Sequence, residues 1–109
     1  MACSHFQVMN FPQPIDEVFE AFAKALPLAG MGYPIKMKDS YQLIANVPTS
    51  AWSWGEKINI SMKEADNGGT SVQVKSESSF SLTLFDWGKN KKNVNQIQMH
   101  VNMILKKKG

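Results

Sequence analysis

Two short segments hold most of the residues that could do chemistry, because each combines a tryptophan, a glycine and an acid. They lie at 52–56 and 85–93. Acid/base catalysis would require a carboxylate from each segment, Glu56 and Asp86, to be held close together in a cleft. The structural alternative is that Asp86 caps nearby backbone N–H groups and that Glu56 is a solvated charge at a strand end. We favour this alternative, because carboxylates with unusual surroundings also occur in purely structural networks.

Other reactive side chains are few. The chain has one cysteine, Cys3, two histidines, His5 and His100, and no CxxC or HExxH motif. A metal site needs several such ligands converging in space, and Cys3 has no nearby glycine turn to serve as an oxyanion hole. Gly68 and Gly69 are followed by a strand pattern rather than a helix, which indicates a hairpin and not a phosphate loop. We therefore expect no metal, no cofactor and no enzymatic activity.

The net charge of +3 is weak evidence for a nucleic-acid partner. It falls to zero without the C-terminal Lys106, Lys107 and Lys108, and all twelve basic residues are lysine. The sequence has no arginine, whose planar fork makes the usual bidentate contacts to phosphate and guanine. The C-terminal lysines are favourable charges at the end of a helix. We therefore give nucleic-acid binding little weight.

The composition is typical of a folded protein with a single domain over residues 1–109. Of the 109 residues, 43% are hydrophobic and 19% are charged, which is enough for one modest core. No apolar run approaches the roughly 18 residues of a membrane helix. The start of the chain lacks the basic and apolar regions of a signal peptide, and a lone cysteine fits a reducing compartment. We expect a cytoplasmic protein.

Apolar spacing predicts two helices. The first has Pro14 in its first turn, ends at Pro27 and has a stripe with three- and four-residue spacing. A last helix is predicted to start near Asn90, whose side chain can cap the first turn, and to carry Asn93, Asn95 and its lysines on the wet side. The two apolar stripes are Ile15, Val18, Phe19, Phe22 and Leu26, and Val94, Ile97, Val101, Ile104 and Leu105.

Alternation of apolar and polar residues predicts five strands. They lie at 6–11, 34–38, 41–47, 57–63 and from residue 70 onward, and the turn signal Asp-Asn-Gly-Gly at 66–69 joins the last two. The last strand directs Val72 and Val74 inward, together with Ser76, Ser78 and Phe80. Inward hydroxyl groups indicate either a satisfied polar patch or an opening in the core.

The predicted order is strand, helix, four strands, helix. A single antiparallel sheet packed on two helices would bury every apolar stripe, so we predict an α+β fold. This order matches the TATA-binding-protein-like and helix-grip (Bet v 1-like) arrangements. Fold alone does not imply function, and at this length any pocket should be small.

The second half of the chain resembles a family of small bacterial proteins. Ser76-x-Ser78, followed by Asp86-Trp87-Gly88-Lys89-Asn90 after a glycine-closed hairpin, resembles the DUF1499 family over residues 45–93. That family carries R-S-x-S-R and then D-x-G-x-N before its last helix; the second spacing matches, whereas the arginines are absent here. Because the family has no established activity, the resemblance implies a small bacterial α+β domain and supplies no mechanism.

Our leading hypothesis is a non-enzymatic domain that binds a small apolar or amphipathic ligand between sheet and helices. The predicted site has the polar groups Ser76 and Ser78 and the walls Tyr41, Trp54, Phe80 and Trp87. The tryptophans could instead plug the ends of the sheet. Asp86, Gly88 and Asn90 are interpreted as a turn and helix cap.

The second hypothesis is a protein-interaction module. It would form a homodimer, or bind another partner, through a sheet edge or through the polar sheet face with Trp52.

Overall fold

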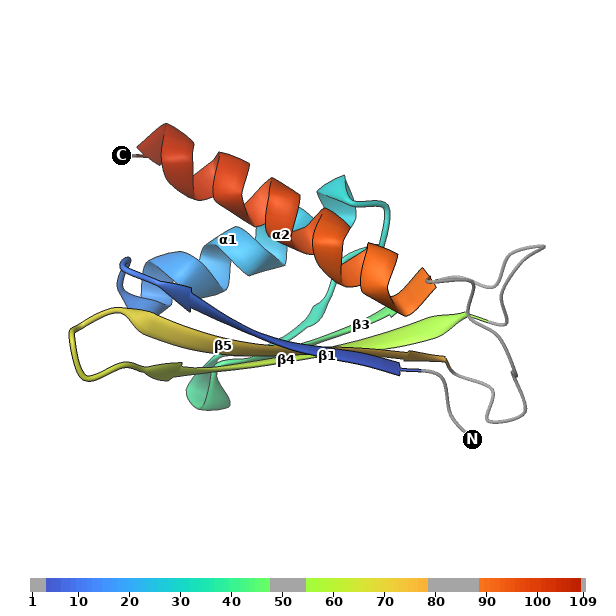
Figure 1. Cartoon of the computed structure of the whole chain (residues 1–109), viewed down its shortest axis with the longest axis horizontal. Helices are drawn as coiled ribbons and strands as arrows, with labels where there is room; N and C mark the ends of the chain where they lie inside the picture. The colour runs from blue at the N-terminus through green and yellow to red at the C-terminus, as the bar shows by residue number, and fades with distance from the viewer. Residues whose placement is uncertain (1–3, 48–54, 79–88, 109) are drawn as a thin grey trace.

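The computed structural model describes residues 4–47, 55–78 and 89–108. Five strands form one antiparallel sheet in the order β1-β5-β4-β3-β2, and both helices lie on one face of it (Figure 1). The predicted fold class and order of elements are confirmed. The elements are β1 (Ser4–Phe11), α1 (Ile15–Leu28), β2 (Ile35–Met37), the 3-10 helix η1 (Lys38–Ser40), β3 (Gln42–Val47), β4 (Glu56–Glu64), β5 (Thr70–Ser78) and α2 (Lys89–Lys108).

Helix α1 begins at Ile15, so Pro14 is its N-cap and not part of its first turn as predicted. The extended conformation of Pro14 and the acids Asp16 and Glu17 in the first turn favour this start. Pro27 lies in the last turn of the helix, which ends one residue later than predicted, at Leu28. The N–H group of Met31 then donates to the Leu26 carbonyl at 2.9 Å, which satisfies the helix end.

The predicted apolar stripes form one core between the sheet and the helices. Helix α2 packs against β5 and β1, whereas α1 packs against α2 and β4. Burial of these side chains supplies the main favourable term in folding. The largest fully buried apolar side chains are Phe19, Phe22, Leu26, Leu43, Ile58, Ile60, Ile97, Val18, Val72, Val74 and Val94.

Tyr41 differs from its predicted place in a strand. It follows η1 with a φ of 52°, in the left-handed region, and β3 begins one residue later at Gln42. Its ring packs edge-on against Phe19 at 5.8 Å, and its hydroxyl donates to Asp16 Oδ1 at 2.7 Å. These contacts compensate for the uncommon backbone conformation.

The turn between β4 and β5 forms as predicted. Gly68 has a φ of 85°, which favours glycine. The N–H group of Gly69 donates to Asn67 Oδ1 at 3.0 Å. Gly69 also lies directly against the Phe11 carbonyl of the neighbouring strand β1, which leaves no room for a Cβ atom. The hairpin therefore needs glycine at two positions for two different reasons.

Candidate functional site

Three polar side chains from three elements meet in the core between the sheet and α2. Glu56 begins β4 and is 1% exposed, Ser76 of β5 is fully buried, and Asn93 in the first turns of α2 is 3% exposed. Asn93 Nδ2 donates to Glu56 Oε1 at 3.1 Å and to Ser76 Oγ at 3.3 Å. One amide group thus joins two strands to the helix, and we call these three residues the buried polar cluster.

Two predictions about this cluster were wrong. Glu56 is not the predicted solvated charge, because it stands two and four residues before Ile58 and Ile60 and therefore shares their core-facing side of the strand. Asn93 was placed on the wet side of the helix, but it precedes Ile97 by four residues and shares that buried face. Both spacings are present in the sequence, and at these two positions spacing predicts burial better than residue polarity does.

The structure does not bring Tyr41 and Ser76 together. The N–H group of Met62 donates to the Tyr41 carbonyl, and Met62 pairs with Val72, four residues from Ser76 along β5. Four residues of a strand span about 13 Å. The inward direction predicted for Ser76 is confirmed, and its hydroxyl belongs to the buried polar cluster.

Most other predicted site residues lie outside the described part of the chain. These are Trp52, Trp54, Phe80, Asp86, Trp87 and Gly88. Ser78 is the last residue of β5, and α2 begins at Lys89, next to its predicted start at Asn90. The side chains of Ser78 and Asn90 are not among those described, so the predicted site and cap remain predictions.

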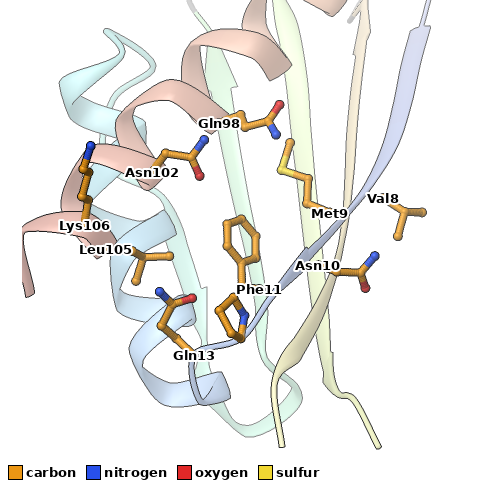
Figure 2. A pocket seen from close by; sticks show the side chains of 10 residues that line it. Val8, Met9, Asn10, Phe11, Gln13, Gln98, Asn102, Leu105 and Lys106 are labelled. Carbon is orange, nitrogen blue, oxygen red and sulfur yellow. The ribbon is translucent and has the colours of Figure 1, made fainter. Parts of the chain in front are cut away.

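A groove of about 660 Å³ lies between α2 and β1, toward the end of β1 that is remote from Ser76. In Figure 2, Phe11, Gln13 and Leu105 point into the space between helix and strand, whereas Val8 and Asn10 lie on the other side of the strand. The lining combines apolar, amide and cationic groups. Its members are Val8, Met9, Asn10, Phe11, Pro12, Gln13, Gln98, Asn102, Leu105 and Lys106.

Gln13 gives this groove an unusual polar feature. Its Oε1 atom is buried and has no hydrogen-bond partner among the described residues. Its backbone carbonyl accepts a hydrogen bond from the buried Thr70 hydroxyl at 2.9 Å, which ties the segment between β1 and α1 to β5. At the groove wall, Gln7 Nε2 donates to Gln98 Oε1 at 3.2 Å and joins β1 to α2. The groove lining thus includes a residue whose buried amide oxygen has no described donor, an uncommon state for a buried acceptor.

The sequence did not predict this groove. Gln13 stands between Pro12 and Pro14, and neither proline can donate a backbone hydrogen bond. A polar residue between two prolines is the one local feature of the sequence that points to this position. The position of α2 over β1, which encloses the groove, could not be read from the chain.

A separate polar cluster joins α1 to η1. Lys38 Nζ lies 2.9 Å from Asp16 Oδ1 and 4.7 Å from the centroid of the Phe19 ring. The hydrogen bond from Lys38, followed by that from Tyr41, lowers the pKa of Asp16, and the same contact with Asp16 raises the pKa of Lys38. The hydrogen bond to Asp16 raises the pKa of Tyr41. This exposed cluster fastens η1 to α1, so we interpret it as structural.

Within the described ranges, no group of three or more histidine, cysteine or acidic residues is arranged to hold a metal ion. In the same part of the chain, no helix has the length and apolar character needed to cross a membrane.

Comparison with known proteins identifies the fold. No family model and no curated protein matches the chain. Among solved structures, the chain is similar to "Crystal structure of Ara h 8.0201", with a TM-score of 0.68 and 11% sequence identity over 97% of this chain and 99% of that chain. At this identity the similarity shows the fold alone, which is Bet v 1-like, or helix-grip. The resemblance to the DUF1499 family stays a prediction.

Proposed function

We propose that this domain binds a small amphipathic ligand in the α2–β1 groove and does not transform it. The observation that carries the proposal is the buried Gln13 Oε1, an acceptor without a described donor at the groove. Leaving such a group unpaired costs about 1–3 kcal/mol. A ligand that supplies an N–H or O–H group would recover much of this free energy on binding.

The groove's other groups define the rest of the ligand. A volume of about 660 Å³ lies within the usual range of roughly 300–1,000 Å³ for small-molecule sites. Met9, Phe11 and Leu105 would cover an apolar body, while the amides of Gln98 and Asn102 would contact polar groups. We therefore infer a ligand with an apolar body and at least one hydrogen-bond donor.

This proposal keeps the predicted ligand class and changes the predicted position. Ser76 already accepts a hydrogen bond from Asn93 in the core, so we assign the ligand's polar contact to Gln13 instead. Lys106 is the one titratable side chain among the described groove residues. General acid/base chemistry usually requires two groups with different protonation states, which favours binding without turnover. The cytoplasmic location inferred from the sequence remains part of this proposal.

Titration with 8-anilino-1-naphthalenesulfonate, an amphipathic fluorescent probe, tests whether the groove binds ligands. Asn102→Phe should fill the groove from an exposed helix position, and Asn95→Phe is its control at an exposed position on the same helix outside the groove. We expect saturable binding that weakens at least tenfold in Asn102→Phe and less than twofold in Asn95→Phe. Equal probe affinity in the two variants, with both folded by circular dichroism, would contradict the proposal.

A second titration tests the role of Gln13. 1-Decanol and decyl methyl ether share an alkyl chain, but only the alcohol can donate a hydrogen bond. The alcohol should displace the probe roughly three- to tenfold better than the ether, which corresponds to about 0.5–1.5 kcal/mol for one hydrogen bond. In Gln13→Leu this preference should disappear. A preference that persists in Gln13→Leu would assign the donor contact to another residue.

The exposed edge of β1 supports protein interaction as a second candidate function. This edge strand has eight residues and neither charge nor proline, with Phe6 and Val8 exposed. The opposite edge, β2, has three residues and includes Lys36. Edge strands are commonly protected by charge, proline or short length, so β1 is the edge suited to pair with a second copy of the chain.

Light scattering after size exclusion tests this candidate. We expect a concentration-dependent dimer that Val8→Lys dissociates and that Asn59→Lys, in the centre of the sheet on β4, leaves intact. A monomer at all concentrations would refute pairing through β1.

A further inference from the structure

Helix α2 carries a strong charge asymmetry. It contains six of the twelve lysines and none of the nine acids. The other six lysines of the chain are outnumbered by those nine acids. One helix therefore holds the chain's positive excess, a distribution associated with binding to anionic surfaces.

The exposed residues of α2 form an ordered stripe. Lys92, Met99 and Lys106 are spaced by seven residues and so lie close to one line along the helix. Met103 follows Met99 by four residues and lies beside it. The two methionines are 51% and 52% exposed, and Lys92 and Lys106 are exposed as well. We call these four residues the α2 stripe; it is about 21 Å long at 1.5 Å per residue.

The stripe has no described partner within the chain. The core-facing stripe of α2 lies on the other side of the helix and includes Val94, Ile97 and Val101. In the described part of the chain, Lys91, Lys92 and Lys106 form no ion pair. Two adjacent exposed methionines between unpaired lysines favour a partner that is both anionic and apolar.

We propose that the α2 stripe docks on the surface of an anionic phospholipid bilayer. A bilayer provides phosphates for the lysines and, a few ångströms deeper, acyl chains for the methionines. Nucleic acid fits less well, because the centre of the stripe is apolar and has no arginine or aromatic side chain to contact phosphates or stack on bases. The helix lies flat on such a surface and does not cross it.

This surface lies mostly outside the proposed ligand groove. Met99, Met103 and Lys92 do not line the groove, so docking does not depend on a ligand. Lys106 belongs to both the stripe and the groove lining, and it is left unchanged in the variants below.

Sedimentation with vesicles tests the proposal on the full chain. The vesicles contain phosphatidylcholine with 30% phosphatidylserine, or phosphatidylcholine alone. We expect binding to the anionic vesicles only, and release at high salt. Lys91→Gln with Lys92→Gln should lower the partition coefficient roughly twentyfold, since each lysine near an anionic surface contributes about fivefold. Lys57→Gln with Lys63→Gln removes the same charge from exposed positions of β4 and should change it less than threefold.

A second variant separates lipid contact from charge alone. Met99→Asn with Met103→Asn should weaken vesicle binding severalfold, leave its salt dependence unchanged and retain groove binding of the fluorescent probe. The proposal is overturned by equal binding to both vesicle types, by no binding to either, or by equal losses in the α2 and β4 lysine variants. Tighter binding to a 20-nucleotide DNA or RNA, unaffected by the methionine changes, would assign the stripe to nucleic acid instead.

Discussion

Asn93→Ala should be among the most destabilising changes at any polar position in the described structure. The variant removes the donor to Glu56 Oε1 and to Ser76 Oγ, both of which are buried. A hydrogen bond to a carboxylate contributes about 1.5–3 kcal/mol, and one between neutral groups about 0.5–1.5 kcal/mol. The bond to Ser76 is long at 3.3 Å, so the lower end of that range applies. We expect a loss of about 3 kcal/mol, a large part of the roughly 5–15 kcal/mol typical of such a domain.

Urea denaturation followed by circular dichroism measures this loss, and Asn95→Ala is the matched control. Asn95 is the same residue type on the same helix but is exposed, so its replacement should change the free energy of unfolding by less than about 0.5 kcal/mol. The melting temperature of Asn93→Ala should fall by about 10–15 °C.

Asn93→Leu separates hydrogen bonding from packing. Leucine is larger than asparagine and donates no hydrogen bond, so this variant leaves no cavity at position 93 and should remain destabilised by about 2 kcal/mol or more. If Asn93→Leu is as stable as the natural chain, the loss in Asn93→Ala reflects only a cavity. If Asn93→Ala and Asn95→Ala are equally stable, the buried polar cluster makes no net contribution and the reasoning is wrong.

Two further predictions concern the α1–η1 contact and the β4–β5 hairpin. The pKa of Asp16 is lowered below its ordinary value of 3.8, so its contribution to stability is present above that pH and is lost as the pH falls through the lowered pKa. The pKa of Lys38 is raised above 10.5, so its contribution is present below that pH and is lost as the pH rises through the raised pKa. Unfolding of Asp16→Asn, measured from pH 2 to 11, should lack both effects, whereas an unchanged profile would show that the contact is not formed in solution. Gly69→Ala should destabilise by several kcal/mol because the new Cβ would collide with the Phe11 carbonyl, and a thermal melt within 2 °C of the natural chain would contradict that packing.

The sequence predicted the architecture well because the apolar spacing is regular. In β4 and in both helices, each apolar position that the spacing assigns to the core is buried or packed against it. Periodicity can be read from residue order alone. The repeats of 2.0 residues in a strand and of 3.6 residues in a helix are easily distinguished over segments as long as these. The order of elements then allowed few topologies besides a helix-grip sheet.

The candidate site was less predictable because it depends on contacts between distant segments. The groove forms where Gln13 meets Leu105, 92 positions later in the chain, and no local pattern reports that proximity. The buried polar cluster was hard to predict for a different reason. Glu56 and Asn93 have core spacing but polar side chains, and burial of polar groups requires a partner that a single strand or helix cannot reveal.

The buried polar cluster also restricts which alternative packings the chain can adopt. A shift of β4 by one residue relative to β5 would turn Glu56 outward and bring Lys57 into the core. The lysine ammonium would then lose its hydration, and the neutral amide of Asn93 could not balance its buried charge. A rotation of α2 by one residue would replace Asn93 with Val94 and remove the amide donor from Glu56. Apolar residues at these positions would tolerate either shift, because apolar side chains of similar volume can replace one another in a core. The cluster therefore destabilises packings with a wrong strand register and packings with a wrong helix rotation. The correct rotation of α2 in turn directs Leu105 toward the groove and Met99 toward solvent.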